Sequence, residues 1–299
     1  MSVLNAIELD KLPPPIFIES LDFEAMFAKM LAKLRQDYPE FSSISEADPA
    51  YKVLQVCAYW RVDDRNRVNE AGKALLLAFA EDADLDHIGI TYYREPRLLI
   101  DAGDENATPP IPPTYEDDDS YRNRLVLEPE GASTAGPIGA YVFHGRSADG
   151  RVKDIGVDSP EPGEIMIYVL SREGDGTASE DLITVVSRHL NGETVRPLCE
   201  GVTVRSALIK PYRVRARLYT YEGPDQSLVL DEAKKKLAEF QVKHHRIEHD
   251  ITMSALYAAL HQPGVQRVEF DEPNADIACG IGEAAYCTDV DVVIAGTAT

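Results

Sequence analysis

Residues 135–206 read AGPIGAYVFHGRSADGRVKDIGVDSPEPGEIMIYVLSREGDGTASEDLITVVSRHLNGETVRPLCEGVTVRS, and this stretch decides the fold. Pro137 begins a predicted helix over 137–146, because proline is well tolerated in the first turn of a helix. Residues 151–158 and 164–170 then alternate in side-chain polarity, as two paired strands do. The stretch therefore begins as a helix followed by a two-stranded hairpin.

The second half of this stretch adds a helix and a strand. Ser179 is the predicted N-cap, and the acidic Glu180 and Asp181 favour the positive end of the helix dipole. Four apolar side chains lie on one side of this helix: Leu182, Val185, Val186 and Leu190. Asn191 ends the helix, and residues 202–208 return as a strand. The predicted fold class is α+β, with a small sheet under helices.

The segment that follows repeats this organisation without obvious sequence identity. It contains predicted strands over 212–221, 247–251, 265–270 and 289–294 and predicted helices over 227–242 and 254–262. We therefore expect two small α+β domains, at residues 131–210 and 211–299.

Residues 1–97 predict a helical region instead. Apolar residues recur at helical spacing over 20–38, with Ser20 as the predicted N-cap and Pro39 as the residue that ends the helix. A second helix is predicted over 49–80, because it begins with proline in its first turn and no helix-breaking residue interrupts it.

The second predicted helix repeats every seven residues. Its predicted seam consists of Leu54, Cys57, Arg61, Asp64, Val68, Ala71, Leu75 and Ala78. This seam is apolar at both ends and charged in the middle. A helix of about 30 residues is about 45 Å long, which is more than one small domain covers, so the seam predicts packing on other chains. The alternative is a hairpin with residues 20–38 of the same chain, with Arg61 and Asp64 at the solvent edge.

Residues 98–130 connect the helical region to the first α+β domain. Four prolines followed by acidic residues are typical of a linker, and these are Pro109, Pro110, Pro112, Pro113, Glu116, Asp117, Asp118 and Asp119. A short helix over 120–128, stopped by Pro129, follows the linker.

Composition restricts the class of protein. The chain has 299 residues, of which 44% are hydrophobic, so it can bury substantial cores. Its net charge of −21 is spread evenly, because residues 1–127 hold 13 basic and 24 acidic residues and residues 128–299 hold 17 and 27. Binding to a nucleic-acid backbone depends on clustered Lys and Arg. We therefore expect no direct nucleic-acid partner.

Cys57, Cys199, Cys279 and Cys287 lie far apart and form no CxxC pair. This spacing predicts buried thiols in a reducing compartment rather than a disulfide framework. No stretch reaches the length of about 20 apolar residues that a membrane span requires, and the N-terminus lacks the pattern of a secretion signal. We expect no membrane insertion, and a protein kept in the cytosol until it joins an assembly.

Asp82, Asp84 and Asp86 alternate as the ligands of a calcium loop do. Such a loop needs Gly at its sixth position and Glu at its twelfth, where this chain has His87 and Tyr93. The expected structure is therefore a turn after the long helix.

His244, His245 and His249 lie in the segment KHHRIEHD. His245 and His249 have the spacing of two zinc ligands on one helix face, but a zinc protease needs Glu directly after the first His, and Glu248 lies elsewhere. We expect a partly solvated junction between a helix and a strand.

Arg213, Arg215 and Arg217 alternate with apolar residues and predict a strand face that carries three guanidinium groups. Within the chain they would form surface ion pairs of little net stability. Across an interface they would orient a partner. Both alternatives stay open.

No motif for catalysis is complete. The Gly-x-Gly segments at 174–176 and 280–282 lack the other residues of a phosphate loop or a dinucleotide fingerprint and predict turns. No Gly-x-Ser-x-Gly elbow occurs. We expect no catalytic residue, no cofactor and no metal ligand, and therefore a protein that is not an enzyme.

Several segments carry a family resemblance through their order and number: LDFEAMF at 21–27, RVNEAGKALLLAFAEDADLDHIG at 67–89, SYRNRL at 120–125, GAYVFHGRSADGRV at 139–152, GEIMIYVLS at 163–171, SALYAALHQPGVQRVEF at 254–270 and AYCT at 285–288. With these segments the chain resembles the baseplate assembly protein J family of contractile phage tails, in particular its P2-like members. The agreement is poorest over 98–118.

The resemblance implies a structural wedge subunit in the baseplate of a contractile tail, or of a tail-derived bacteriocin, assembled in the bacterial cytoplasm. Family members associate in pairs within each wedge and join wedges into a six-fold ring around the tail hub. Their N-terminal helices form a bundle with a second copy and a baseplate protein I-like partner, and the remainder contacts the sheath-proximal wedge protein. The implied function is mechanical, since the ring waits and then rearranges when the tail engages a host.

Two other classes of function stay open. One is a tail enzyme that cleaves cell-wall glycan or peptide, which a glycan-cleavage assay would test. The other is an assembly chaperone that is absent from the finished particle. In the wedge picture Arg61 and Asp64 set register and partner choice. We therefore expect Arg61→Leu to leave the isolated chain folded but to loosen pairing specificity, and unchanged wedge assembly would contradict this.

Overall fold

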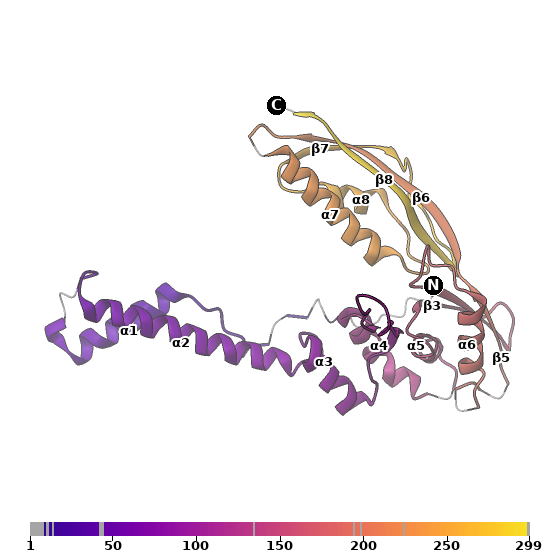
Figure 1. The fold of residues 1–299 in the computed structure, drawn as a ribbon, viewed down its shortest axis with the longest axis horizontal. Coiled ribbons are helices and arrows are strands. Elements are labelled where there is room, and N and C mark those ends of the chain that lie inside the picture. Colours follow the sequence, from indigo (N-terminus) through magenta and orange to yellow (C-terminus); the bar gives the residue numbers. More distant parts are fainter. Residues whose placement is uncertain are drawn as a thin grey trace. The chain divides into compact units, whose positions relative to one another are not determined.

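The computed structural model describes residues 9, 12–13, 15–41, 45–133, 135–193, 195–197, 199–223 and 225–297. Its fold class is α+β, as predicted (Figure 1). The chain divides into two compact units, a helical unit (Asn5–Pro96) and an α+β unit (Arg97–Thr299). The domain boundaries expected at residues 97, 130 and 210 stay predictions.

Two helices dominate the helical unit, α1 (Phe23–Asp37) and α2 (Pro49–Ala74). Asp22 rather than Ser20 caps α1, because its side chain accepts a hydrogen bond from the backbone N–H of Ala25. α2 ends at Ala74 instead of continuing to residue 80. A tighter turn follows it, in which the N–H of Leu76 donates to the carbonyl of Lys73 at 2.9 Å.

Short helical elements complete this unit: η2 (Pro39–Phe41), α3 (Asp82–Ile88) and η3 (Gly89–Tyr93). Asp82, Asp84 and Asp86 lie in α3, so the prediction of a turn at these residues was wrong. Asp82 and Asp84 occupy the first turn, where carboxylates are favoured by the helix dipole.

The α+β unit begins with a two-stranded ribbon, where a linker had been expected. β1 (Leu99–Asp101) pairs antiparallel with β2 (Thr114–Tyr115). α4 (Asp118–Gly131) follows and contains Pro129, so proline does not stop this helix. Pro129 lies two residues before the end of α4, so few helical residues follow the hydrogen bond that its missing N–H removes.

The first sheet of the α+β unit agrees with the prediction. α5 (Ile138–Ser147) precedes the antiparallel pair β3 (Val152–Asp158) and β4 (Glu164–Ser171), and α6 (Glu180–Leu190) leads to β5 (Gly201–Ser206), which is parallel to β4. The strand order is β3-β4-β5. The core side chains of this layer include Tyr141, Phe143, Ile155, Ile167, Val169, Leu182, Val186 and Leu190.

The second sheet has the strand order β7-β6-β8. Its elements are β6 (Leu208–Thr220), α7 (Gln226–His244), α8 (Met253–Leu260), β7 (Val265–Glu272) and β8 (Glu283–Thr297). Figure 1 shows α7 and α8 against one face of this sheet. The core between helices and sheet includes Val214, Ala216, Leu218, Ala233, Leu237, Leu256, Leu260 and Val292.

Residues 247–251 do not form the expected strand. Ile247 and Ile251 each make a single bridge, to Ala284 and Ile277. Between them Glu248 has a φ of 59°, and this left-handed conformation is incompatible with an extended strand.

The two sheets of the α+β unit are connected by one residue. β5 ends at Ser206 and β6 begins at Leu208. The N–H of the intervening Ala207 donates to the carbonyl of Val169 in β4 at 2.8 Å. The Gly-x-Gly segments at 174–176 and 280–282 contain turns, as predicted.

Candidate interaction surfaces

α1 and the segment before it pack on one side of α2. The ring of Phe27 meets the ring of Tyr51 edge-on at 4.8 Å between centroids. Ala58 is fully buried, and a Cβ atom at Gly72 would lie 2.1 Å from the ring of Phe17. The hairpin that was the alternative to packing between chains is therefore formed, and small residues of α2 allow its close approach.

Polar contacts also hold the segment before α1 on α2. Arg65 donates from Nε to a carboxylate oxygen of Glu19 at 2.6 Å, and this hydrogen bond lowers the pKa of Glu19. Asn69 donates from Nδ2 to the backbone carbonyl of Glu19 at 2.9 Å and accepts from its N–H at 3.1 Å. Asn69 is buried, so these bonds satisfy a polar side chain inside the hairpin.

The other side of α2 presents large apolar side chains to solvent. Trp60 is 59% exposed, Val68 is 67% exposed and Leu75 is 79% exposed. We call this surface the outer stripe, and it comprises Val53, Val56, Cys57, Trp60, Asp64, Val68, Ala71 and Leu75. Its members recur every three or four residues and therefore share one side of the helix. One aspartate interrupts this otherwise largely apolar surface.

The outer stripe and the predicted seam share five residues: Cys57, Asp64, Val68, Ala71 and Leu75. Leu54 is half-buried, and Arg61 is exposed beside the stripe. Sequence reasoning missed Val53, Val56 and Trp60. The position of the chain's one tryptophan within this helix was a usable signal, because tryptophan is enriched among the residues that dominate protein interfaces.

A shallow depression adjoins the hairpin. It lies between α2 and the start of α1 and has a volume of about 380 Å³. Its lining is mainly apolar and comprises Leu21, Phe23, Tyr59, Val62, Asp63 and Asn66.

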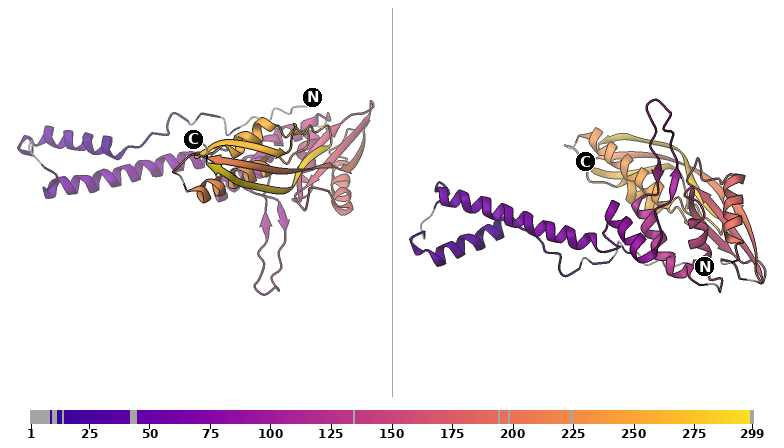
Figure 2. Two further views of the ribbon diagram at one scale, coloured as in Figure 1. Left: turned by 90° about the horizontal axis from the view of Figure 1, so that it is seen from above. Right: turned by 60° about the horizontal axis from the view of Figure 1, so that its bottom comes forward.

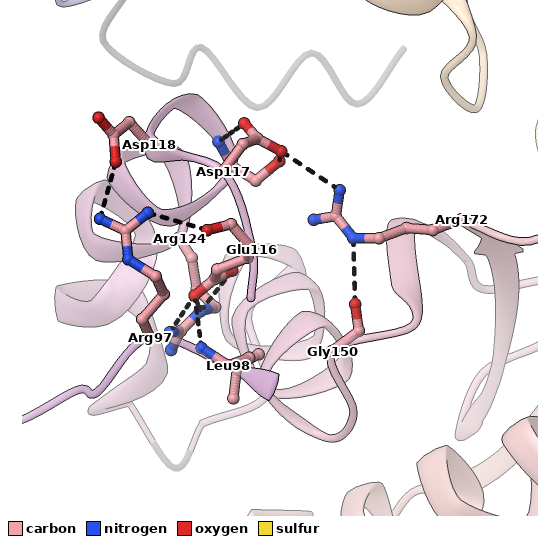
Figure 3. A network of polar contacts seen from close by, with 9 residues as sticks. Arg97, Leu98, Glu116, Asp117, Asp118, Arg124, Gly150 and Arg172 are labelled. Atoms are coloured by element: carbon pink, nitrogen blue, oxygen red, sulfur yellow. Dashed lines mark hydrogen bonds and ion pairs between the residues drawn. The ribbon is translucent and has the colours of Figure 1, made fainter. Parts of the chain in front are cut away.

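A polar network fixes the base of the β1–β2 ribbon in the α+β unit (Figure 3). At its centre Glu116, which is 4% exposed, forms an ion pair with Arg124, which is 1% exposed. The same carboxylate accepts the N–H of Leu98 at 3.1 Å, and Arg97 donates to the carbonyl of Glu116 at 2.8 Å. The residues that enter and leave the ribbon are therefore held together through one buried carboxylate.

Further contacts join this base to the first sheet. Arg172 donates to the carbonyl of Gly150 at 3.0 Å and lies 3.6 Å from the carboxylate of Asp117. Burial acts to raise the pKa of Asp117, but hydrogen bonds from Ser120 outweigh it and the pKa lies below its ordinary value. A Cβ atom at Gly150 would lie 2.1 Å from the carbonyl oxygen of Leu99. Only glycine permits this approach of the ribbon.

Arg213, Arg215 and Arg217 lie on the exposed side of β6, as their alternation with buried residues predicts. Arg217 forms an ion pair with Asp271 at 2.8 Å, and Arg215 lies 3.9 Å from Asp289. These pairs are exposed and contribute little to stability. An additional role at an interface stays a proposal.

The three histidines gather where α7 ends. Phe240 stacks on His244 with 4.0 Å between ring centroids, and His249 lies beside His244 with 4.6 Å between centroids. Burial lowers the pKa of His244 to about 4, and the charge of His249 acts in the same direction. Burial and the nearby Lys153 lower the pKa of His245 to about 4. The imidazoles are therefore neutral near neutral pH.

The cysteines differ from the prediction of buried thiols. All four are free, but Cys57 and Cys199 are exposed. Cys57 lies on the outer stripe and Cys199 in the loop before β5, and neither position faces a core. Cys279 and Cys287 are half-buried, and burial raises the pKa of both thiols.

The described part of the chain contains neither a metal-binding cluster nor a helix suited to cross a membrane. Within it, no group of three or more His, Cys, Asp or Glu side chains is arranged to hold a metal ion. None of the helices described there combines the length and the apolar character needed to cross a membrane.

Comparison with known proteins adds independent evidence. A family model described as the Baseplate J-like N-terminal domain matches residues 46–104. Baseplate protein J of Escherichia phage P2 is 46% identical over 298 residues, which cover 97% of this chain and 98% of that protein. The cryo-EM structure of the anti-feeding prophage baseplate, symmetrised six-fold, contains a chain with a TM-score of 0.38 and 13% identity, covering 61% of this chain and 44% of that one. By its identity to the P2 protein over nearly its whole length, the chain belongs to the baseplate protein J family.

Proposed function

We propose that this chain is a structural subunit of the baseplate of a contractile phage tail, or of a tail-derived bacteriocin. The observation that carries the proposal is the 46% identity to Baseplate protein J of phage P2 over 97% of the chain. The match covers both units of the chain and nearly the whole length of the P2 protein, which supports a shared place in the particle. The chain would be located in the virion baseplate after assembly in the host cytoplasm.

The helical unit would form the contact within a wedge. In this proposal two copies place their outer stripes against each other and against a baseplate protein I-like partner. Trp60 and Leu75 support the idea, because a contiguous exposed apolar surface marks a protein contact and tryptophan dominates many interfaces. Asp64 would fix the register, because a charge inside an apolar contact requires a matching partner.

The α+β unit would form the remaining contacts of the wedge. These are contacts to the sheath-proximal wedge protein, to the tail hub and to neighbouring wedges in a six-fold ring. Arg213, Arg215 and Arg217 are the candidate surface, because guanidinium groups on a rigid strand orient a partner. On host engagement the subunits would rotate as rigid bodies at these contacts.

Mass spectrometry of purified tail particles tests the location. The expected result is a stoichiometric component in a fixed ratio to the sheath protein. An assembly chaperone would instead be present in extracts and absent from particles, which would refute the proposal.

Two matched substitutions test the pairing. Val68 on the outer stripe is 67% exposed and Val242 on α7 is 70% exposed, so both tolerate a polar residue in the isolated chain. We expect Val68→Asp to raise the dissociation constant of the pair about tenfold or more in sedimentation experiments. Val242→Asp should leave it unchanged. Equal dissociation constants for the two variants would show that the outer stripe does not form the contact between the two copies.

A further inference from the structure

We propose that the proline-rich strand of the β1–β2 ribbon, residues 109–115, docks into an aromatic-lined groove with a basic rim on another protein of the particle. This inference rests on the proposed function, because it requires neighbouring proteins in an assembly. Figure 2 shows the ribbon as a narrow two-stranded arm.

The pairing inside the ribbon determines which groups point outward. The N–H of Ile111 donates to the carbonyl of Asp104 at 2.9 Å, and the N–H of Asp104 donates to the carbonyl of Ile111 at 2.9 Å. Both backbone groups of Ile111 are therefore used within the ribbon. In an antiparallel pair the residues on either side face the opposite edge, and here they are Pro110 and Pro112.

That outer edge cannot accept another strand. Proline has no N–H, and four of the five residues from 109 to 113 are prolines. An edge without donors cannot continue a sheet ladder, so addition of a strand from a partner is blocked. Recognition must then use side chains and backbone carbonyls.

Proline-rich recognition uses these groups. The pairing of Ile111 with Asp104 and of β2 with β1 holds the segment extended. Proline also fixes φ near −65°, so the segment loses little entropy on binding. Its side chains are available, because residues 109–115 are all exposed, with Ile111 at 54% and Tyr115 at 53%. A groove lined by Trp or Tyr accepts the proline rings and donates to their carbonyls.

The negative charge of the ribbon predicts a basic rim on the groove that binds it. Asp101, Asp104 and Glu105 are exposed on the same ribbon, and none of them forms an ion pair with another described residue. Basic residues at the rim would pair with these carboxylates. A second copy of this chain is a poorer match, because its net charge is −21 and the aromatic depression beside α2 carries Asp63 and no Lys or Arg.

The base of the ribbon presents the strand in a fixed direction. Glu116 and Arg124 form a buried pair at the exit, and Gly150 contacts the backbone of Leu99 at the start. A preorganised element loses less entropy when it binds. The polar network in Figure 3 therefore orients the β1–β2 ribbon and also stabilises the α+β unit.

Photo-crosslinking in tail particles tests the inference. A benzophenone amino acid replaces Ile111 in the full chain, and the matched control replaces Leu228, which is also exposed and apolar but lies on α7. We expect the probe at residue 111 to crosslink to a peptide of another particle protein that contains aromatic and basic residues, and the control to give no such peptide. No crosslink from residue 111 in particles that contain the chain, or a crosslink to a second copy, would overturn the inference and leave the proposed function intact. Absence of the chain from particles would overturn both.

A binding measurement with the crosslinked protein, once purified, gives a second test. The double variant Ile111→Asp with Tyr115→Asp should raise the dissociation constant about tenfold or more. Leu228→Asp should leave it unchanged. Both variants alter exposed residues and should keep the melting temperature of the parent chain. Unchanged affinity in the ribbon variant would overturn the inference.

Discussion

The α+β unit and the helical unit treat large apolar side chains differently. In the α+β unit Leu182 and Leu218 have no exposed area, whereas in the helical unit Trp60 is 59% and Leu75 is 79% exposed. Burial of apolar area is the main stabilising contribution in folding. The α+β unit also exposes apolar residues such as Leu228 and Val242. In the helical unit, however, the exposed apolar residues of the outer stripe share one side of α2, and this side keeps contiguous apolar area available for association.

The ion pairs of the two units differ in the same way. Arg124 and Glu116 of the α+β unit are almost completely buried, whereas the side chains of Arg65 and Glu19 in the helical unit are 34% and 47% exposed. Removal of one partner of a buried ion pair destabilises the protein strongly, because the other charge stays buried without compensation. An exposed ion pair contributes little to stability. Substitutions should therefore affect the stability of the α+β unit much more than that of the helical unit.

The largest effect is expected from Glu116→Ala. It leaves the Arg124 guanidinium buried without its carboxylate, and such a change costs about 3–5 kcal/mol. Chemical denaturation followed by circular dichroism measures the loss. As a control, Glu116→Leu combined with Arg124→Met removes both charges and should recover most of the stability. A small loss in the single variant would show that the pair is accessible to water.

Leu182→Ala should have the next largest effect. Leu182 has no exposed area in the core beneath α6, and truncation of a buried leucine costs about 2–5 kcal/mol. The same denaturation experiment applies. The fluorescence of Trp60, in the helical unit, should report little change, which separates the two units. A simultaneous shift of both signals would show that they unfold together.

Acidification should destabilise the α+β unit. The pKa values of His244 and His245 are lowered to about 4 by burial, against an ordinary value of 6.5. Between these values the unfolded chain binds protons that the folded chain does not, so stability decreases as pH falls from 6.5 towards 4. Urea midpoints at about pH 7.5 and about pH 5 should show this loss. His244→Gln combined with His245→Gln should reduce it, and an equal loss in this variant would assign the effect to other groups.

Trp60→Ala should have the smallest effect on stability. Its side chain is exposed, so the free energy of unfolding of the isolated chain should change by less than about 0.5 kcal/mol. Association should weaken about tenfold or more if the outer stripe forms the pair. Sedimentation measures association and denaturation measures stability. A large loss of stability in the monomer would erase the contrast between the two units.

Elements with local signals are predictable from the sequence. Ser179 caps α6, accepting a hydrogen bond from the N–H of Leu182 at 3.3 Å, and the apolar side of the helix is buried as expected. The alternation along β6 likewise predicts which residues are buried. In both cases the pattern that predicts the element lies within the residues of that element.

The ribbon is not predictable in this way. Its prolines and acidic residues have the composition of a linker, and the contacts that order it come from distant positions. Gly150 and Arg172 lie more than 30 residues beyond Glu116 in the chain. The amino-acid composition of the ribbon segment does not reveal contacts with such distant residues.

The outer stripe is predictable in part. A strict seven-residue repeat selects Val68 and Leu75 but omits Trp60. The side of α2 that faces α1 is determined by small and polar residues, Ala58 and Asn69, which a search for large apolar residues passes over. The predicted seam consequently agrees with the outer stripe from Asp64 onward. Before Asp64 it differs by one residue, because it contains Leu54 and Arg61 where the outer stripe contains Val53 and Trp60.

The single residue between β5 and β6 has a mechanical consequence. Consecutive Cα atoms are about 3.8 Å apart, so Ala207 leaves no slack between the two sheets. The backbone N–H groups of Ala207 and Leu208 donate to the carbonyls of Val169 and Gly282, both at 2.8 Å, and hold this connection in place. We therefore expect tension applied to one sheet to reach the other directly through this connection, because no loop lies between them that could extend first.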